Sequence, residues 1–259
     1  MTSSYKNLNR REFFRAGASV AAASSFPMFT QPDMYKEIPD FENEKSLFKR
    51  LQEIPTPLIM DAMARLGADR TSLAMSGNIR PMIRSKGTII GPAVTTKYEI
   101  SDQPTRAQDI RDYVFNPVDE AAPGSIWVNA CGTTQILSMF GDVIVLACHK
   151  KGLSGLVTDG GCRDIEGIEQ IGLPVYAAGT CLYGPGSVIR PVGANVPVVC
   201  GGLKIIPGGI VAADVNGIMT FPRVALPDIV SVIEELRNKE NQTRRDIEKG
   251  SSLNEAYVF

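Results

Sequence analysis

Short apolar runs, separated by turns that contain Gly or Pro, recur along most of this chain. Runs rich in β-branched residues predict strands, and apolar residues three or four positions apart predict helices. The predicted strands are 87–98, 124–129, 153–158 and 174–178, with further short strands between 197 and 221. The predicted helices are 56–67, 141–151, a short helix ending at 171 and a charged helix from 227 to 249. This interleaving predicts one α/β domain in which sheets are layered against helices.

Residue types at two predicted helices refine this picture. Thr56 is expected to cap the first helix, with Pro57 in its first turn and Gly67 at its end. The segment 141–151 contains Val-Ile-Val, which also suits a strand. A helix is favoured there, because another strand follows directly after Gly152.

The first thirty residues differ from the rest. Asn9 to Arg15 (NRREFFR) resembles a twin-arginine export signal, and a mildly apolar, Ala-rich stretch follows from Ala16 to Phe29. That stretch is too short for a transmembrane helix, which needs ~20 residues. The alternative is a disordered basic tail with an incidental Arg pair. The expected organisation is a signal peptide at 1–30, a linker and lead-in at 31–53, the folded domain at 54–250 and a tail at 251–259. The protein is expected to be exported to the periplasm, or to be cytoplasmic if the signal is not used.

Composition removes several classes of function. The net charge is −1, so no global field favours nucleic acid or an anionic membrane. His149 is the single histidine, which excludes a multi-histidine zinc site and leaves oxygen ligands, as Mg²⁺ or Mn²⁺ prefer. It is expected to be a helix-end residue rather than a catalyst. The five cysteines form no C-x-x-C pair and are expected to be small buried hydrophobes.

The segment 155–164 (GLVTDGGCRD) carries the most chemical information. An apolar strand ends at Asp159, two glycines allow a tight turn, and Arg163 and Asp164 stand together at a helix start. Arg offers a planar fork for a carboxylate, and the adjacent Asp is suited to a hard cation. The alternative is structural: Asp164 caps the next helix and Arg163 pairs with a surface acid.

This segment and its surroundings resemble the RraA-like family, which contains the 4-hydroxy-4-methyl-2-oxoglutarate / 4-carboxy-4-hydroxy-2-oxoadipate aldolases. The likeness spans residues 54 to 250. The segments that carry it are 91–95 (GPAVT), 140–142 (FGD), 159–164 (DGGCRD), 172–179 (GLPVYAAG), 197–198 with 201–202 (PV, GG), 207–209 (PGG), 213–214 (AD) and 216–218 (NGI). The implied fold is a single layered αββα sandwich domain of the swivelling β/β/α type.

The resemblance implies roles for particular residues. Asp164 takes the position of the direct protein ligand of Mg²⁺ or Mn²⁺, and Arg163 that of the residue that contacts substrate and a catalytic water. Gly141, Asp142, Val143 and Ile144 correspond to the backbone pocket for the pyruvyl carboxylate. In addition, Asp142 would orient water at the metal. In the family, a Glu of the last helix reaches in from a neighbouring subunit. Glu240 is the best match, with Glu234 and Glu235 nearby.

The implied activity is divalent-metal-dependent cleavage of a 4-hydroxy-2-oxo acid to pyruvate and a second carbonyl compound, with oxaloacetate decarboxylation at the same site. The expected assembly is a homotrimer or homohexamer without a nucleic-acid partner or membrane anchor. One departure concerns 103–116, where aldolase members carry further substrate contacts but this chain does not align clearly.

Three other functions remain open. The first is a non-catalytic regulator, because RraA itself is a ribonuclease-binding inhibitor in the same family. The second is a demethylmenaquinone methyltransferase, for which no Gly-rich nucleotide site is present. The third is a Schiff-base aldolase that uses Lys97 or Lys204.

Overall fold

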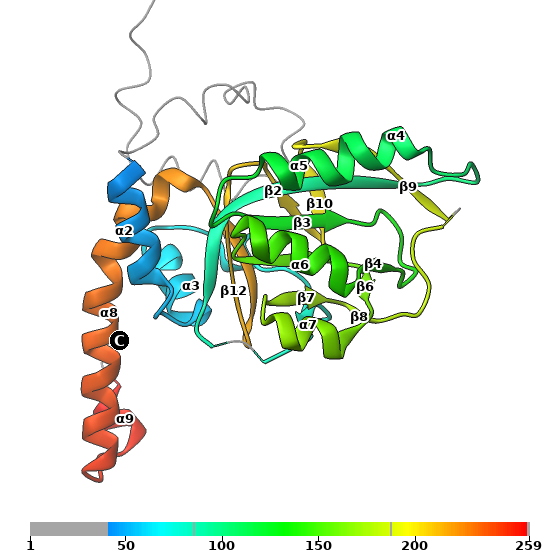
Figure 1. Cartoon of the computed structure of the whole chain (residues 1–259). Helices are drawn as coiled ribbons and strands as arrows, with labels where there is room; N and C mark the ends of the chain where they lie inside the picture. The colour runs from blue at the N-terminus through cyan, green and yellow to red at the C-terminus, as the bar shows by residue number, and fades with distance from the viewer. Residues whose placement is uncertain (1–40, 85, 187, 258–259) are drawn as a thin grey trace, which may run out of the picture.

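The computed structural model describes residues 41–84, 86–186 and 188–257 (Figure 1). These residues form a mixed α/β fold with a curled sheet, which confirms the expected fold class. The strands are β1 Arg80–Pro81, β2 Ile89–Ile100, β3 Ile126–Ala130, β4 Ser138–Phe140, β5 Gly155–Thr158, β6 Gly161–Cys162, β7 Val175–Ala177, β8 Gly179–Thr180, β9 Ile189–Ala194, β10 Val198–Cys200, β11 Leu203–Ile205, β12 Ile210–Asp214 and β13 Gly217–Phe221.

The helices flank these strands at one face and at one end. They are α2 Phe41–Leu51, α3 Thr56–Arg65, η3 Arg70–Ser72, α4 Ala107–Ile110, the π-helix η4 Arg111–Phe115, α5 Asn116–Glu120, α6 Asp142–Lys151, α7 Ile165–Ile171, η5 Arg223–Ala225, α8 Leu226–Glu248 and α9 Leu253–Ala256. Strands 87–98 and 124–129, helix 141–151 and the charged helix from 227 were predicted close to these bounds.

The main sheet has the strand order β1-β7-β5-β3-β2-β12-β13, and β9 also pairs with β2. Strands β2, β3, β5 and β7 run parallel, whereas β9 and β12 run antiparallel to β2. Every residue of β3 and of β5 is buried, as expected for parallel strands covered on both faces. A second, three-stranded sheet of order β4-β6-β8 is entirely parallel.

The helices divide into two groups around the sheet. Helices α4, α5, α6 and α7 lie along one face (Figure 1), where a buried cluster includes Trp127, Phe140 and Ile168. Helices α2, α3 and α8 gather at the end that contains β12 and β13, around a second cluster that includes Ile59 and Ile229. The distal half of α8 extends beyond this end, and accordingly the buried residues of α8 stop at Ile233.

The start of α3 differs from the expectation. Thr56 was expected to be the cap, but the N-cap residue is Pro55 and makes no side-chain cap hydrogen bond. Instead, the N–H and hydroxyl of Thr56 donate to the two carboxylate oxygens of Asp214, at 2.8 and 2.7 Å. A carboxylate far along the chain therefore caps this helix, and local spacing could not have shown it.

The two ends of the chain relate differently to the expected boundaries. The predicted export signal at 1–30 lies outside the described residues. The expected lead-in at 31–53 contains helix α2, whose Leu47 and Leu51 are buried in the second cluster. The expected tail contains α9, which carries a capping box between Ser252 and Glu255. Within the described part of the chain, no helix is long and apolar enough to cross a membrane.

Candidate functional site

The carboxyl ends of β4, β6 and β8 meet at one edge of the small parallel sheet. The chain leaves these strands at Gly141, Arg163 and Cys181. Backbone hydrogen bonds hold the ends together, from Arg163 N to Phe140 O at 3.0 Å and from Cys181 N to Cys162 O at 3.1 Å. Ligands of α/β proteins commonly bind at such an edge, because the loops that follow parallel strands converge there. We call this edge, with the start of α6, the candidate site.

Asp164 projects its carboxylate across the strand ends. Its backbone is left-handed, with φ 58° and ψ 44°, a conformation that Asp tolerates better than most residues but that still costs about 1 kcal/mol or more. A Cβ atom placed on Gly141 would lie 2.8 Å from Oδ2 of Asp164, so a side chain at position 141 would displace this carboxylate from its present position. Asp164 occupies the N-cap position of α7 but makes no side-chain cap hydrogen bond. The structural alternative is therefore wrong in its first part, a side-chain cap by Asp164, whereas Arg163 does lie beside an exposed acid, Asp164 itself.

Arg163 lies beside this carboxylate. Its Nε is 3.5 Å from Oδ2 of Asp164, and its Nη1 donates to the carbonyl oxygen of Leu182 at 3.3 Å. The exposed fractions of the two side chains are 50% for Arg163 and 47% for Asp164. An ion pair this exposed contributes little to stability. Both groups are therefore open to a ligand, and most of the guanidinium N–H groups remain free to bind one.

The start of α6 adds backbone donors to the same edge. The first four N–H groups of a helix have no partner within the helix, and its dipole favours an anion there. Gly141 precedes α6, and the N–H of Val143 donates to Oδ1 of Asp142 at 2.7 Å. The structure thus brings 141–144, Arg163 and Asp164 together. The Val143 donor is already engaged by Asp142, so an incoming carboxylate would have to displace that side chain or use its neighbours.

Asp142 points toward α7 rather than along the strand ends. A Cβ atom placed on Gly167 would lie 2.9 Å from Oδ2 of Asp142. Asp142 also borders a shallow groove of about 410 Å³ between α6 and α7, together with Val143, Leu146 and Lys150. Its carboxylate therefore flanks the candidate site from the side of α7.

Asp159, the first residue of the predicted motif, has a structural role that spacing did not indicate. Its Oδ1 accepts the N–H of Cys131 at 2.8 Å, and its Oδ2 accepts the N–H of Gly201 at 3.2 Å. This carboxylate ties the end of β3 and the turn after β10 to the loop that leads into β6. It holds the Gly-Gly turn in place so that Arg163 and Asp164 follow at a fixed position.

Within one chain, Glu240 does not lie at the candidate site. It is on the extended part of α8, at the other end of the molecule from α6 and α7, and it pairs with Arg244 one turn away at 2.6 Å. The two neighbouring candidates are tied to their own domain. Glu234 pairs with Arg50 of α2, and Glu235 pairs with Arg65 of α3.

The cysteines match the expectation that they act mainly as small hydrophobes. Cys131, Cys148, Cys162 and Cys200 are buried, and Cys181 is partly exposed. Burial, with a contribution from nearby Asp164, raises the pKa of Cys162 to about 11. Burial, with a contribution from Asp159, raises the pKa of Cys131 to about 12. Neither thiol is a thiolate nucleophile at neutral pH.

Two other candidates also have structural explanations. His149 lies in the last turn of α6, at the helix end, as expected. Lys97 is partly exposed and pairs with Glu99 at 2.6 Å, and Lys204 is exposed. Both lysines border a cavity of about 240 Å³, but neither has the buried setting that activates a Schiff-base lysine.

The donor set of the candidate site fits a water-rich divalent cation. No group of three or more His, Cys, Asp or Glu side chains that could hold a metal occurs in the ranges that the structure describes. Mg²⁺, however, keeps several waters and commonly binds through one or two carboxylates. The half-exposed carboxylate of Asp164, which lies against Gly141, meets that requirement.

Comparison with known proteins gives the same family. Residues 56–220 match the RraA-like family described as Aldolase/RraA. The chain belongs to this family.

Individual relatives and a solved structure agree with this assignment. A protein of Halalkalibacterium halodurans, provisionally named as a 4-hydroxy-4-methyl-2-oxoglutarate aldolase, is 24% identical over 83% of this chain and 95% of its own. An uncharacterised protein of Methanocaldococcus jannaschii is 27% identical over 68% of this chain and 80% of its own. Streptomyces coelicolor RraAS2, an unusual member of the RNase ES inhibitor RraA protein family, superposes with a TM-score of 0.66 at 26% identity, over 80% of this chain and 98% of its own.

Proposed function

We propose that this chain is a divalent-metal-dependent lyase that cleaves a 4-hydroxy-2-oxo acid into pyruvate and a second carbonyl compound. In this reaction the C3–C4 bond breaks, C4 becomes a carbonyl as its hydroxyl loses a proton, and C3 gains a proton to give pyruvate. The same site would decarboxylate oxaloacetate, because negative charge develops on the same pyruvyl half. The relatives that are provisionally named as aldolases support this class of reaction.

One observation carries the proposal. The carboxylate of Asp164 and the guanidinium of Arg163 lie side by side, half exposed, at the carboxyl edge of three parallel strands and against the start of α6. The Asp164 side chain does not cap α7, and the two side chains are left half exposed beside each other. Asp164 would hold Mg²⁺ or Mn²⁺, and the bound cation would supply Lewis-acid stabilisation of the developing negative charge.

The chain's own groups have separate tasks in this scheme. Free N–H groups at 141–144 would hold the pyruvyl carboxylate, assisted by the dipole of α6. Arg163, fixed by its contact with the Leu182 carbonyl, would stabilise negative charge on the substrate as the bond breaks. Asp142, at the flank of the site, would orient water for proton transfer.

We also propose that Glu240 acts in a neighbouring subunit of a homotrimer or homohexamer. Glu234 and Glu235 are engaged by α2 and α3 of their own chain, whereas Glu240 lies on the extended part of α8. Replacing Glu240 by Gln should therefore lower kcat in the assembled protein, and the same change at Glu234 should not. Equal activity of the two variants would remove Glu240 from the scheme.

Pyruvate release tests the proposal. Purified chain is assayed with 4-hydroxy-2-oxo acids and with oxaloacetate, with Mg²⁺, with Mn²⁺ and with excess chelator. Asp164→Ala should lower kcat/KM by roughly 10³-fold, because Lewis-acid stabilisation contributes several kcal/mol. Glu169→Ala, an exposed acid further along α7, is the matched control and should keep full activity.

Two outcomes would count against the proposal. Wild-type activity that survives the chelator would exclude the metal mechanism. No pyruvate from any substrate would favour a non-catalytic regulator, because RraAS2 is described as an unusual member of the RNase ES inhibitor RraA protein family. Export through residues 1–30 remains a separate proposal, and fractionation of cells that express the full chain and an Arg10→Lys, Arg11→Lys variant tests it.

A further inference from the structure

A cavity of about 240 Å³ lies at the carboxyl ends of β2 and β3, on the side of the β10–β11 hairpin. Strand β10 packs against both of these strands (Figure 1). The apolar part of the lining comes from Ala130 at the end of β3 and from Val198 and Val199 of β10. Gly132 also borders the cavity, and a Cβ atom placed on it would lie 2.6 Å from the carbonyl oxygen of Tyr98. The backbone after β3 therefore lies close against the end of β2.

Two lysines border this cavity, and no acid is among the residues that line it. Lys97 of β2 pairs with Glu99 at 2.6 Å, so its charge is largely balanced. Lys204 of β11 is exposed and makes no ion pair within the described part of the chain. It is the cross-strand partner of Val199, whose side chain is 61% exposed. The cavity therefore combines an apolar wall with one unbalanced positive charge.

The main sheet separates this cavity from the candidate site. Ala130 and Val198 belong to the buried cluster on the hairpin side of β3. Trp127 and Phe140 belong to the cluster on the other side, where α6 and α7 lie. Successive residues of a strand point to opposite faces, so Ala130 and Trp127 cannot line the same space. A ligand held beside the hairpin would therefore be a second ligand, distinct from the substrate of the candidate site.

We propose that this cavity is a second binding site, and that it takes a small organic monoanion with an apolar body, such as an aromatic carboxylate. Lys204 would pair with the carboxylate of the ligand, assisted by Lys97. Ala130, Val198 and Val199 would contact its apolar part. A compact hydrated anion would gain nothing from these apolar side chains, and a neutral molecule would gain nothing from the lysines. The inference does not depend on the proposed lyase function.

Three probes separate the contributions of charge and of apolar contact. Benzoate has both features, benzyl alcohol lacks the charge, and acetate lacks the apolar body. Saturation-transfer difference NMR follows each probe as it is titrated into the full chain. We expect saturable binding of benzoate with a Kd on the order of millimolar, as is typical of so small a ligand. Benzyl alcohol and acetate should each bind at least roughly threefold more weakly, because each lacks one of the two contributions.

Charge substitutions show where benzoate binds. Lys204→Glu should weaken its binding by roughly tenfold, because a repulsion replaces an attraction beside the carboxylate. Lys204→Gln only removes the charge and should cause a smaller loss in the same direction. Neither variant should change the binding of benzyl alcohol. Lys239→Glu, at an exposed position of α8, makes the same change in net charge as Lys204→Glu and is the matched control. It should leave the Kd of benzoate at its wild-type value.

Arg163→Ala distinguishes this cavity from the candidate site. Benzoate bound at the candidate site would lose affinity in this variant, whereas benzoate beside the hairpin should keep its wild-type Kd. Thermal unfolding midpoints of all variants are measured alongside, so that a loss of fold is not mistaken for a loss of binding. The absence of saturable benzoate binding, equal Kd values for the wild type and Lys204→Glu, or a loss of binding in Arg163→Ala would each overturn the inference. None of these results would affect the lyase assignment.

Discussion

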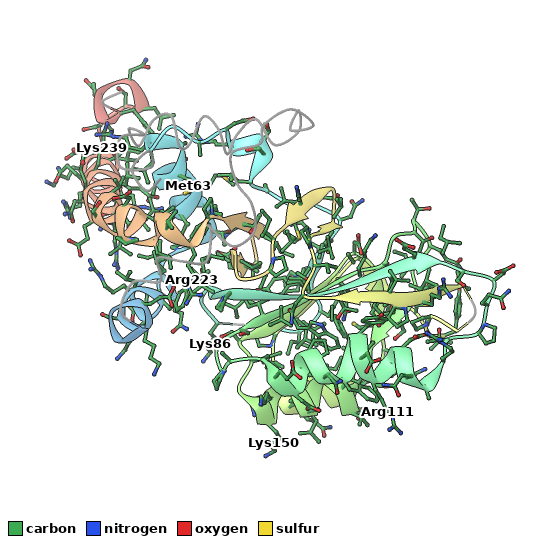
Figure 2. The ribbon with its side chains drawn as sticks, turned by 90° about the horizontal axis from the view of Figure 1, so that it is seen from above. Met63, Lys86, Arg111, Lys150, Arg223 and Lys239 are labelled. Atoms are coloured by element: carbon green, nitrogen blue, oxygen red, sulfur yellow. The ribbon has the colours of Figure 1, made fainter. Side chains whose placement is uncertain are left out.

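Two arginine–carboxylate pairs at opposite ends of this fold show how the same chemical partners serve different purposes. Arg223 of η5 donates from Nε and Nη2 to both oxygens of Glu44 on α2, and Glu44 is only 1% exposed. Arg163 and Asp164 stand 3.5 Å apart and half exposed at the candidate site. In Figure 2, Arg223 lies by α2 and α8, whereas Lys150 marks the far end of α6 on the other part of the molecule.

The difference follows from what each pair joins. Arg223 and Glu44 are 179 residues apart, and their contact fastens α2 to the start of α8. Arg163 and Asp164 are adjacent and join no two elements, so their proximity does little for stability. The buried pair, in which both carboxylate oxygens of Glu44 accept hydrogen bonds, stabilises the fold. The exposed pair, in which Asp164 has a left-handed backbone, keeps polar atoms that can still bind a ligand. Substitutions at Glu44 and at Arg163 test this contrast, and a third, at Cys148, tests a buried thiol of α6; they follow in order of decreasing effect.

Glu44→Ala should cause the largest loss of stability. It leaves Arg223 largely buried without its partner, and breaking a buried pair in this way costs about 3 kcal/mol. Denaturant unfolding of the full chain measures this change. Glu234→Ala removes the exposed partner of Arg50 and should cost less than about 1 kcal/mol. If the two variants unfold alike, the proposed fastening by Glu44 is wrong.

Arg163→Lys should reverse this pattern, with a loss of activity and little loss of stability. Lysine keeps the charge but loses the planar fork. One lost charge-assisted hydrogen bond predicts a decrease in kcat/KM of roughly 10- to 100-fold. The unfolding free energy should stay near that of the wild type, because the pair is half exposed. Arg65→Lys, in an exposed pair with Glu235, is the control.

Cys148→Ala should have the smallest effect of interest, a change in the pH dependence of stability in alkaline solution, in addition to the packing that it loses at every pH. Burial raises the pKa of Cys148 from its ordinary 9 to about 12, so the folded state retains a proton that the unfolded state loses. Its contribution to stability is therefore present below pH 9 and is lost as the pH rises toward 12, at ~1.4 kcal/mol per pH unit.

The alanine variant should show a shallower decrease of unfolding free energy over this range. Val145→Ala, on the same buried face of α6, separates the lost packing from the lost titration and should keep the wild-type slope. A Cys148→Ala slope identical to that of Val145→Ala would contradict this assignment of the thiol.

Sequence reasoning predicted the long regular elements well because they have a strong local signal. The β-branched run of β2 and the Gly-bounded apolar helix α6 were predicted within a few residues. The Asp214 cap of Thr56 was missed, because it joins residues 158 positions apart. The two-residue strands β6 and β8 were also missed, since strands that short have no periodicity, although they define the edge on which the site lies.

The candidate site shows the same division. Arg163, Asp164 and 141–144 were predicted from the family resemblance, and the structure brings them together. The contact of Gly141 with the Asp164 carboxylate, and the hydrogen bond from Arg163 to the Leu182 carbonyl, depend on strand ends that meet only in the folded chain.

Binding of Mn²⁺ tests whether Asp164 holds a divalent cation, and it needs no knowledge of the substrate. Electron paramagnetic resonance follows free Mn²⁺ as it is titrated into the full chain, into Asp164→Ala and into Glu169→Ala. We expect saturable binding by the wild type and by Glu169→Ala, and loss of that binding in Asp164→Ala. Equal binding by the wild type and Asp164→Ala would contradict the role of Asp164 as the metal ligand.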